Sequence, residues 1–169
     1  FFLNIFTSLA IFDLLRSRIG GGVTIKWPND LLVNGKKLCG ILIENQIQGA
    51  QVSKSLIGIG INVNQEQFNH PNATSMSREA KADFSLPLIL EELLGNLEAA
   101  YLQLKEGKMS ALKARYQSQL FWLNEKHQFS SAGRIFDGTL TGIDSSGRLV
   151  ISTGEGLRSF QFKEVSFIY

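Results

Sequence analysis

Residues 24–44 read TIKWPNDLLVNGKKLCGILIE, a hairpin pattern that carries more polar groups than a buried hairpin needs. The dipeptide Asn34-Gly35 separates two apolar runs, LLV before it and LCGILI after it. Asn-Gly between such runs is the strongest short-range signal for a two-residue hairpin turn. This stretch therefore predicts two antiparallel strands, and the polar side chains on them need a separate explanation.

The turn also predicts the register of the hairpin and brings an acid close to a base. The expected pairs are Val33 with Lys36, Leu32 with Lys37 and Leu31 with Leu38. Asp30 then becomes a diagonal neighbour of Lys37, at roughly 7–8 Å between backbones. At that spacing both groups can address one small ligand, whether or not they pair with each other. Lys36 falls on the opposite face, and a lysine beside Asn-Gly is also a common solvated edge residue.

A third strand is predicted for SLIGIGINVN, residues 55–64. Gly58 and Gly60 share one face with Asn62 and Asn64, whereas the other face is filled by Ile57, Ile59, Ile61 and Val63. Glycine inside a strand often marks the close approach of a ligand or of another backbone, so this face predicts a flat floor under a ligand. A bulge or tight sheet packing is the alternative reading. GIGIN fits neither the dinucleotide fingerprint nor the P-loop.

Helices are predicted on both sides of these strands. A helix over residues 8–19 is stopped by three glycines, Gly20 to Gly22. Residues 65–84 are polar and aperiodic, and are expected to form a loop. Ser85 is a plausible N-cap with Pro87 in the first turn of a helix that ends at Gly107, and its predicted core stripe is Leu90, Leu93, Leu94, Leu97, Tyr101 and Leu104. A shorter helix is expected over residues 109–120.

The chain changes character near residue 124. From Lys126 onward, short alternating segments are broken by glycine-containing turns at the even spacing of a small antiparallel barrel or sandwich. We therefore expect two units, residues 1–123 and 124–169. Together they predict an α+β protein with a small β unit at its C-terminal end.

Composition narrows the function classes. The chain has 169 residues, 44% hydrophobic and 19% charged, and no apolar run approaches the ~20 residues that cross a bilayer, which predicts a soluble globular protein. The net charge of +2 is spread along the chain, which argues against nucleic acid or a membrane as the main partner. The single cysteine, Cys39, excludes an internal disulfide and fits a cytoplasmic location; a reactive thiol is the less favoured reading.

The strings KWPNDLLVNGKKLCGILIE and LIGIGINVN together resemble the catalytic core of the biotin protein ligases, also called biotin-[carboxyl carrier protein] ligases. The resemblance implies a catalytic domain of the class II aminoacyl-tRNA-synthetase-like fold, present in part, followed by an SH3-like β barrel. It implies that ATP, with Mg²⁺, activates biotin as biotinyl-AMP, and that a lysine of a biotin carboxyl carrier protein then takes the biotinyl group.

The same resemblance assigns roles to residues of this chain. It implies Lys37 as the active-site lysine and Asp30 as the group that helps the incoming amine. The implied binding residues are Asn29 near the phosphates, Gly40, Gly58 and Gly60 along the biotin, and Asn62 near the base of the adenylate, with Lys37 among them. Lys26 and Trp27 belong to the motif and are expected either to be structural or to support the site without touching the ligand, and no residue is expected to be a dedicated metal ligand.

One family feature has no match in this sequence. The arginine-rich loop of the GRGRxGR type, which closes over biotin and phosphate, is not found. We therefore expect the C-terminal part of a ligase catalytic domain plus its β unit, impaired when alone and able to form a homodimer. Two alternatives stay open: a lipoate-type protein ligase, and a non-catalytic module that binds the carrier protein.

Overall fold

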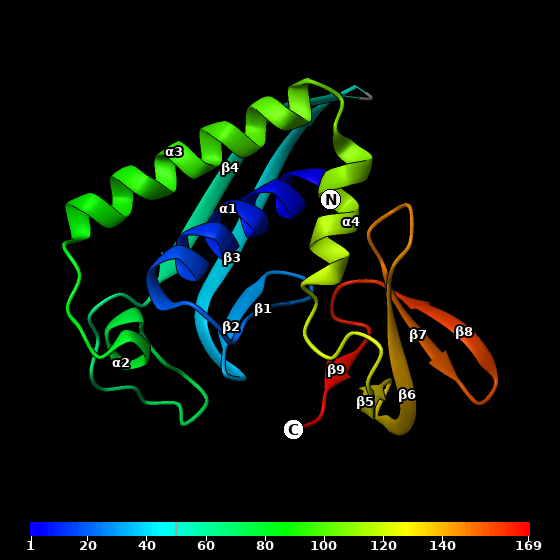
Figure 1. Ribbon diagram of the computed structural model, residues 1–169. Coiled ribbons are helices and arrows are strands. Elements are labelled where there is room, and N and C mark those ends of the chain that lie inside the picture. Colours follow the sequence, from blue (N-terminus) through cyan, green and yellow to red (C-terminus); the bar gives the residue numbers. More distant parts are fainter. Residues whose placement is uncertain (50) are drawn as a thin grey trace.

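The computed structural model describes residues 1–49 and 51–169, and it consists of two antiparallel sheets with helices packed against the first (Figure 1). The first sheet has the order β1-β2-β3-β4, with bounds Val23–Lys26, Asp30–Val33, Lys36–Gln48 and Gln51–Ile61. The second has the order β8-β7-β6-β5-β9, with bounds Gly156–Phe160, Leu149–Thr153, Arg134–Ile143, Lys126–Ser131 and Ser166–Phe167. The predicted α+β class is confirmed.

Helix α1 (Phe2–Ile19) forms the centre of the larger unit. It begins earlier than predicted and ends where predicted, at Gly20, whose backbone has φ of 90°. Leu9, Ile11 and Leu14 are fully buried, because the first sheet covers one side of α1 while α3 (Leu86–Lys105) and α4 (Met109–Ser118) cover others. Figure 1 shows α1 between the strands and these two helices.

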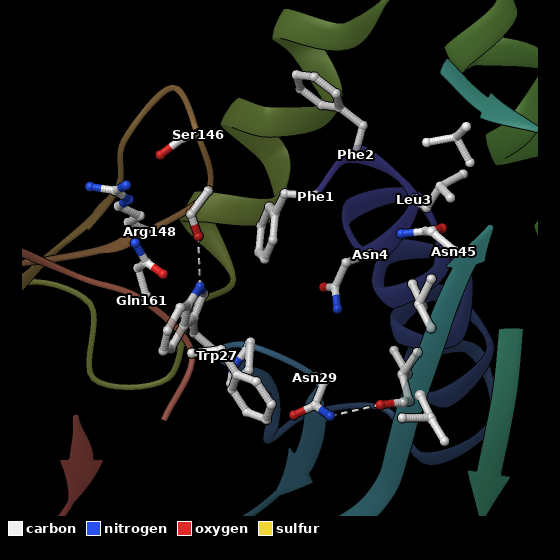
Figure 2. A pocket seen from close by; sticks show the side chains of 17 residues that line it. Phe1, Phe2, Leu3, Asn4, Trp27, Asn29, Asn45, Ser146, Arg148 and Gln161 are labelled. Atoms are coloured by element: carbon white, nitrogen blue, oxygen red, sulfur yellow. Dashed lines mark hydrogen bonds between the residues drawn. The ribbon is translucent and has the colours of Figure 1, made fainter. Parts of the chain in front are cut away.

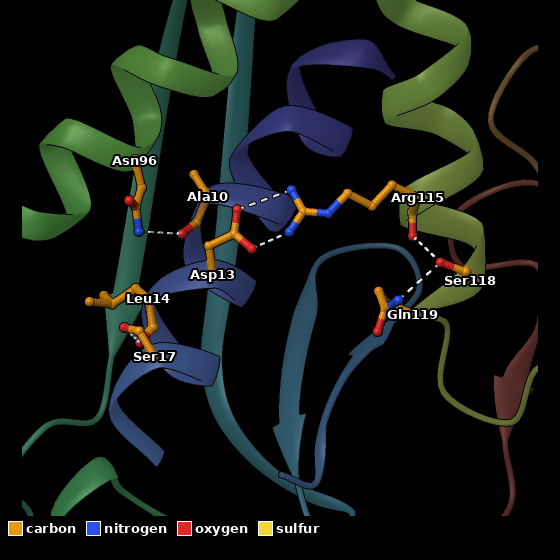
Figure 3. A network of polar contacts seen from close by, with 8 residues as sticks. All are labelled: Ala10, Asp13, Leu14, Ser17, Asn96, Arg115, Ser118 and Gln119. Atoms are coloured by element: carbon orange, nitrogen blue, oxygen red, sulfur yellow. Dashed lines mark hydrogen bonds and ion pairs between the residues drawn. The ribbon is translucent and has the colours of Figure 1, made fainter. Parts of the chain in front are cut away.

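Polar contacts join the helices at the rim of this core (Figure 3). Arg115 of α4 makes a two-pronged ion pair with Asp13 of α1, and the Asn96 side chain of α3 donates to the carbonyl of Ala10 at 3.3 Å. Both members of the ion pair are more than 40% exposed, and exposed pairs contribute about 0–1 kcal/mol. Apolar burial therefore dominates the packing of these helices.

The predicted core stripe of α3 is correct in part. Leu93 is buried, and Leu97 and Leu104 pack against the core, but Leu90, Leu94 and Tyr101 are 48–57% exposed. The buried face is rotated toward Ile89, Leu93 and Ala100, and Ala100 packs with Phe6 and Ala10 of α1. The prediction was therefore wrong for Leu90, Leu94 and Tyr101.

The segment predicted as a loop, residues 65–84, contains a short helix, α2 (Met76–Ala80). Ser75 caps this helix by accepting from the Arg78 backbone N–H at 3.3 Å, and its own hydroxyl donates to the Gln65 carbonyl at 2.7 Å. Met76 is fully buried. The prediction of a plain loop was wrong, because Met76 is the single buried apolar side chain described in this segment and leaves no apolar periodicity to detect.

The C-terminal sheet confirms the predicted small β unit. The segment that leads into it is hydrogen-bonded to both sheets. The Phe121 N–H donates to the Ile25 carbonyl of the first sheet at 2.9 Å, and the Asn124 N–H donates to the Leu140 carbonyl of the second at 2.7 Å. The strand pairing described for this sheet runs from β8 to β9 without a contact that closes it. Closure into a barrel and the boundary at 123/124 stay predictions. Within residues 1–49 and 51–169, no helix is both long and apolar enough to cross a membrane.

Tyr116 of α4 provides a test of the core. Its side chain is fully buried, and its hydroxyl finds no hydrogen-bond partner among the described residues. Because a buried unsatisfied hydroxyl costs free energy, Tyr116→Phe should raise the free energy of unfolding by about 1 kcal/mol in urea titrations. Tyr101→Phe is the matched control, since its exposed hydroxyl should change stability by less than about 0.5 kcal/mol. A lower stability of Tyr116→Phe would mean that the hydroxyl has a partner, such as a buried water.

Candidate active site

The first hairpin contains a bulge, and the predicted acid and base are in contact beside it. Val33 pairs with Lys36 and Leu32 with Lys37, as predicted, but Leu31 pairs with Cys39 instead of Leu38. That third pair was wrong because β3 has one extra residue, Leu38, which has no partner on β2. The Lys37 backbone bonds on the side away from β2, to the Asn72 carbonyl at 2.8 Å and the Thr74 N–H at 2.9 Å. The extra residue shifts the register so that Asp30 lies opposite Gly40.

Asp30 and Lys37 form an ion pair, with Nζ 2.6 Å from Oδ1. The Asp30 side chain is 19% exposed, whereas that of Lys37 is 51% exposed. The sequence left open whether the two groups pair, and in this structure they do. Because Lys37 is half in solvent, its ammonium can leave Asp30 for a nearby anion without breaking the packing of the sheet.

Gly40 makes room for this pair. A Cβ built at Gly40 would lie 3.3 Å from the Lys37 Nζ and 3.6 Å from the Asp30 Oδ1. Gly40 lies opposite Gly60 on β4, and Gly58 lies opposite Leu42. A Cβ at Gly60 would be 3.8 Å from the Gly40 carbonyl oxygen and would have no side chain within 4 Å, so the backbone is bare at Gly60. The ion pair thus stands at the edge of a bare strip of backbone.

The alternation predicted for β4 is confirmed. Gly58 and Gly60 are on the exposed face of the sheet, and Ile57, Ile59 and Ile61 are half-buried against the core on the other. The strand itself runs from Gln51 to Ile61, so it starts and ends earlier than predicted. The open face of β3 and β4 is therefore a glycine floor, defined by Gly40, Gly58 and Gly60.

The asparagines have structural partners. The Asn29 side chain donates to the Ile41 carbonyl at 2.7 Å, and the Ile41 N–H donates to the Asn29 carbonyl at 2.8 Å. Asn62 donates to the Thr74 carbonyl at 3.0 Å, and Asn64 donates to the Phe84 carbonyl at 2.8 Å. Asn62 and Asn64 thus fasten the segment that carries α2, and Asn29 fixes the end of β2 to β3.

A cleft of about 680 Å³ opens beside these residues (Figure 2). It lies between the β3 segment 41–45, the first turn of α1, residues 27–29, and a C-terminal turn that includes Ser146 and Arg148, with Gln161 beside it. Asn29 and Ile41 line it and directly adjoin Asp30 and Gly40, although Asp30 and Lys37 are outside its lining. Sequence reasoning missed Arg148 and Gln161, because nothing in the local sequence indicates that the second unit faces the hairpin.

The family models match both units of the chain. Residues 3–62 match the biotin/lipoate A/B protein ligase family, and residues 129–167 match the biotin protein ligase C-terminal domain. Together these matches cover more than half of the chain. The chain belongs to the biotin protein ligase family. The second match favours the biotin branch over the lipoate branch, since its description names biotin protein ligase alone.

Named relatives of this ligase family agree. The bifunctional ligase/repressor BirA of Bacillus subtilis is 30% identical over 168 residues, which cover 96% of this chain and 52% of that protein. A biotin--[acetyl-CoA-carboxylase] ligase of Paracoccus denitrificans is 28% identical over 177 residues, covering 98% of this chain and 72% of its own. The chain thus spans about half the length of the first of these curated relatives.

Solved structures of biotin protein ligases share the fold. Apo biotin protein ligase from Aquifex aeolicus superposes with a TM-score of 0.82 at 26% identity, covering 99% of this chain and 74% of that one. The same enzyme in complex with biotin and ATP gives a TM-score of 0.81 at 26% identity, covering 99% and 71%. The arrangement of the two sheets is therefore that of a ligase of this family.

Cys39 lies beside the Asp30–Lys37 pair but is shielded from solvent. Its side chain is 1% exposed, and burial, helped by the Asp30 charge, raises the pKa of its thiol to about 12. Because the thiolate is the nucleophile, we expect iodoacetamide at pH 8 to modify native Cys39 at least about 100-fold more slowly than the urea-unfolded chain. Equal rates would contradict this burial. The raised pKa also makes the stability of the fold depend on pH. The neutral Cys39 thiol gives its whole contribution to the free energy of unfolding below pH 9, the pKa of an exposed thiol, and this contribution is lost as the pH rises toward 12.

Proposed function

We propose that this chain is part of an enzyme that attaches biotin to a lysine of a biotin carboxyl carrier protein, through biotinyl-AMP. The observation that carries the proposal is the Asp30–Lys37 ion pair at the edge of the glycine floor. A bare strip of backbone suits a flat ligand, and the pair supplies one cation and one carboxylate where that ligand would end. Membership in the ligase family supports this reading.

The first step joins two anions, the carboxylate of biotin and the triphosphate of ATP. A biotin carboxylate oxygen attacks the α-phosphorus, a P–O bond to the β-phosphate breaks, and pyrophosphate leaves. The Lys37 ammonium would turn from Asp30 toward the phosphates and stabilise the charge that develops there. Mg²⁺ would enter with the nucleotide, since it commonly keeps several waters and binds through substrate phosphates. Asn29, which lines the cleft next to Asp30, would lie near the phosphates.

The second step needs a neutral amine. The ε-amine of the carrier lysine attacks the acyl carbon of biotinyl-AMP, the C–O bond to the phosphate breaks, and AMP leaves. The Asp30 carboxylate, once Lys37 has moved, would accept a hydrogen bond from the incoming ammonium and take up its proton. Lys37 would thus act in the first step, and Asp30, freed when the Lys37 ammonium turns away, would act in the second.

The other roles predicted for the site are part of this proposal. Gly40, Gly58 and Gly60 would lie along biotin, and Asn62 near the base of the adenylate. The carrier protein would approach through the cleft beside Asn29, and a homodimer stays a prediction. The cytoplasm is proposed because ATP is the co-substrate and Cys39 is unpaired. This chain is proposed to act without nucleic acid or membrane.

The test is biotin-dependent exchange of labelled pyrophosphate into ATP. It should be run on the 169-residue chain and on the chain extended by whatever its reading frame encodes before Phe1. We expect exchange with biotin and not with lipoate in the extended chain, and much slower exchange in the 169-residue chain. Exchange with lipoate alone would keep the adenylate chemistry and change the substrate. No exchange with either acid, together with co-purification of a carrier domain, would support the binding-module alternative.

A further inference from the structure

A buried hydrogen bond connects the KWPND segment to the C-terminal sheet. The indole Nε1 of Trp27 donates to the carbonyl oxygen of Gly147 at 2.9 Å, across 120 residues of sequence, as Figure 2 shows. The Trp27 side chain is only 4% exposed. A buried indole N–H needs an acceptor, so Gly147 restricts where Trp27 can lie.

The turn that supplies this acceptor is itself held in place. One carboxylate oxygen of Asp144 accepts from the Ser146 N–H at 2.8 Å, the Ser146 hydroxyl at 2.7 Å and the Arg148 N–H at 3.1 Å. These bonds, that of the Ser146 hydroxyl first, hold the pKa of Asp144 below its usual range. Lys113 of α4 also donates to the Asp144 carbonyl at 2.7 Å. The turn is therefore fixed both internally and to the first unit.

Gly147 is needed at this position for two reasons. Its φ of +86° is in the left-handed region, and a Cβ built there would collide with the ring of Phe1. The turn thus packs directly against the start of α1. The Gly147 carbonyl is consequently held in one position, which fixes where the Trp27 indole N–H can lie.

The other end of the Trp27 segment is equally well held. Asn29 exchanges two hydrogen bonds with Ile41 of β3, at 2.7 and 2.8 Å. Asp30 follows immediately, with its carboxylate 2.6 Å from the Lys37 Nζ. Residues 27–30 therefore bridge the C-terminal turn and β3, and the Asp30 carboxylate stands at the end of this bridge.

We propose that Trp27 is a positioning residue for Asp30, and that the C-terminal sheet sets the placement of the Asp30 carboxylate through the Trp27–Gly147 hydrogen bond. This inference rests on the proposed function, because it assigns the sheet a part in the amide-forming step. The glycine floor is formed by β3 and β4, which Trp27 does not hold directly. Loss of the hydrogen bond should therefore affect transfer to the carrier more than binding of biotin.

The test replaces Trp27 by 3-benzothienylalanine, which keeps the shape of the indole but has sulfur in place of the N–H. The experiment uses the chain together with the sequence that its reading frame places before Phe1. We expect kcat for transfer of biotin to a carrier domain to fall about 10-fold or more, as small misplacements of reacting groups do. The KM for biotin in pyrophosphate exchange should change less than about 2-fold.

Trp122 provides the matched control. Its ring stacks on His127 at 3.7 Å between centroids, and its indole N–H has no acceptor among the described residues. The same substitution at position 122 should leave transfer unchanged. A normal kcat for transfer with the analogue at position 27 would overturn the inference, even if thermal stability falls, because Trp27 would then be a packing residue only.

A second readout separates this inference from the proposed function. The ¹³C signal of the Asp30 carboxyl in the 169-residue chain should shift with the analogue at position 27 and stay unchanged with the analogue at position 122. An unchanged signal in both would overturn the inference whatever the enzyme does. If the parent chain shows no biotin-dependent exchange but the signal moves, the proposed function fails and the positioning of Asp30 by Trp27 stands.

Discussion

Lys37→Gln is expected to lower biotin-dependent pyrophosphate exchange about 10²–10³-fold, the usual effect of removing one group that stabilises transition-state charge. Glutamine keeps much of the length and the hydrogen-bonding capacity of lysine but not its charge. The loss should appear in kcat, because the charge develops in the transition state as the biotin carboxylate reaches the α-phosphate. The folded structure should tolerate the change, since the Lys37 side chain is half exposed.

Lys36→Gln is the matched control for that experiment. Lys36 is exposed, adjacent in sequence, equal in charge, and lies opposite Val33 at the hairpin turn. It should change exchange less than about 2-fold, because a surface charge change away from the reacting atoms has little effect. Equal losses in the two variants would point to a general charge effect on nucleotide approach, and normal exchange in Lys37→Gln would remove Lys37 from the first step.

The hairpin shows how far local sequence predicts a site. Asn34-Gly35 correctly predicts the turn and the two nearest pairs, because turn chemistry acts over a few residues. The bulge was not predictable, because Leu38 and Cys39 are both apolar and both buried, so the alternation that fixes register is lost there. Residues 72–74 bond to the Lys37 backbone on the side away from β2, a contact that the sequence also did not indicate. Asp30 and Lys37 share a face in the predicted register too, so the sequence predicted them as neighbours and left open only their direct contact.

The glycine face of β4 could be predicted from the sequence, whereas the cleft could not. The shared, exposed face of Gly58 and Gly60 was predicted correctly, because the period of two along a strand assigns faces without any knowledge of the rest of the fold. The contribution of the C-terminal turn could not be found in this way. Ser146, Gly147 and Arg148 read only as a turn, and their position beside Trp27 results from how the second sheet packs on the first.

Gly60→Val is expected to weaken biotin binding about 10- to 100-fold while leaving the fold intact or slightly more stable. The backbone of Gly60 is extended, and a Cβ there would meet only the Gly40 carbonyl oxygen, at an ordinary contact distance of 3.8 Å. Valine in a strand is also favoured over glycine, which should add up to about 1 kcal/mol to the free energy of unfolding.

Gly60→Val would therefore lower the affinity for biotin without destabilising the fold. The valine methyl groups would stand on the open face beside Gly40, where the proposed biotin site has no room for them, and overpacking of that size costs about 1–3 kcal/mol. Titration calorimetry of biotin into the extended chain measures the loss, and Gly60→Ala should give an intermediate affinity. Because stability and affinity should move in opposite directions, misfolding cannot imitate the result. Biotin binding by Gly60→Val at the level of the parent chain would mean that the ligand does not lie on the glycine floor.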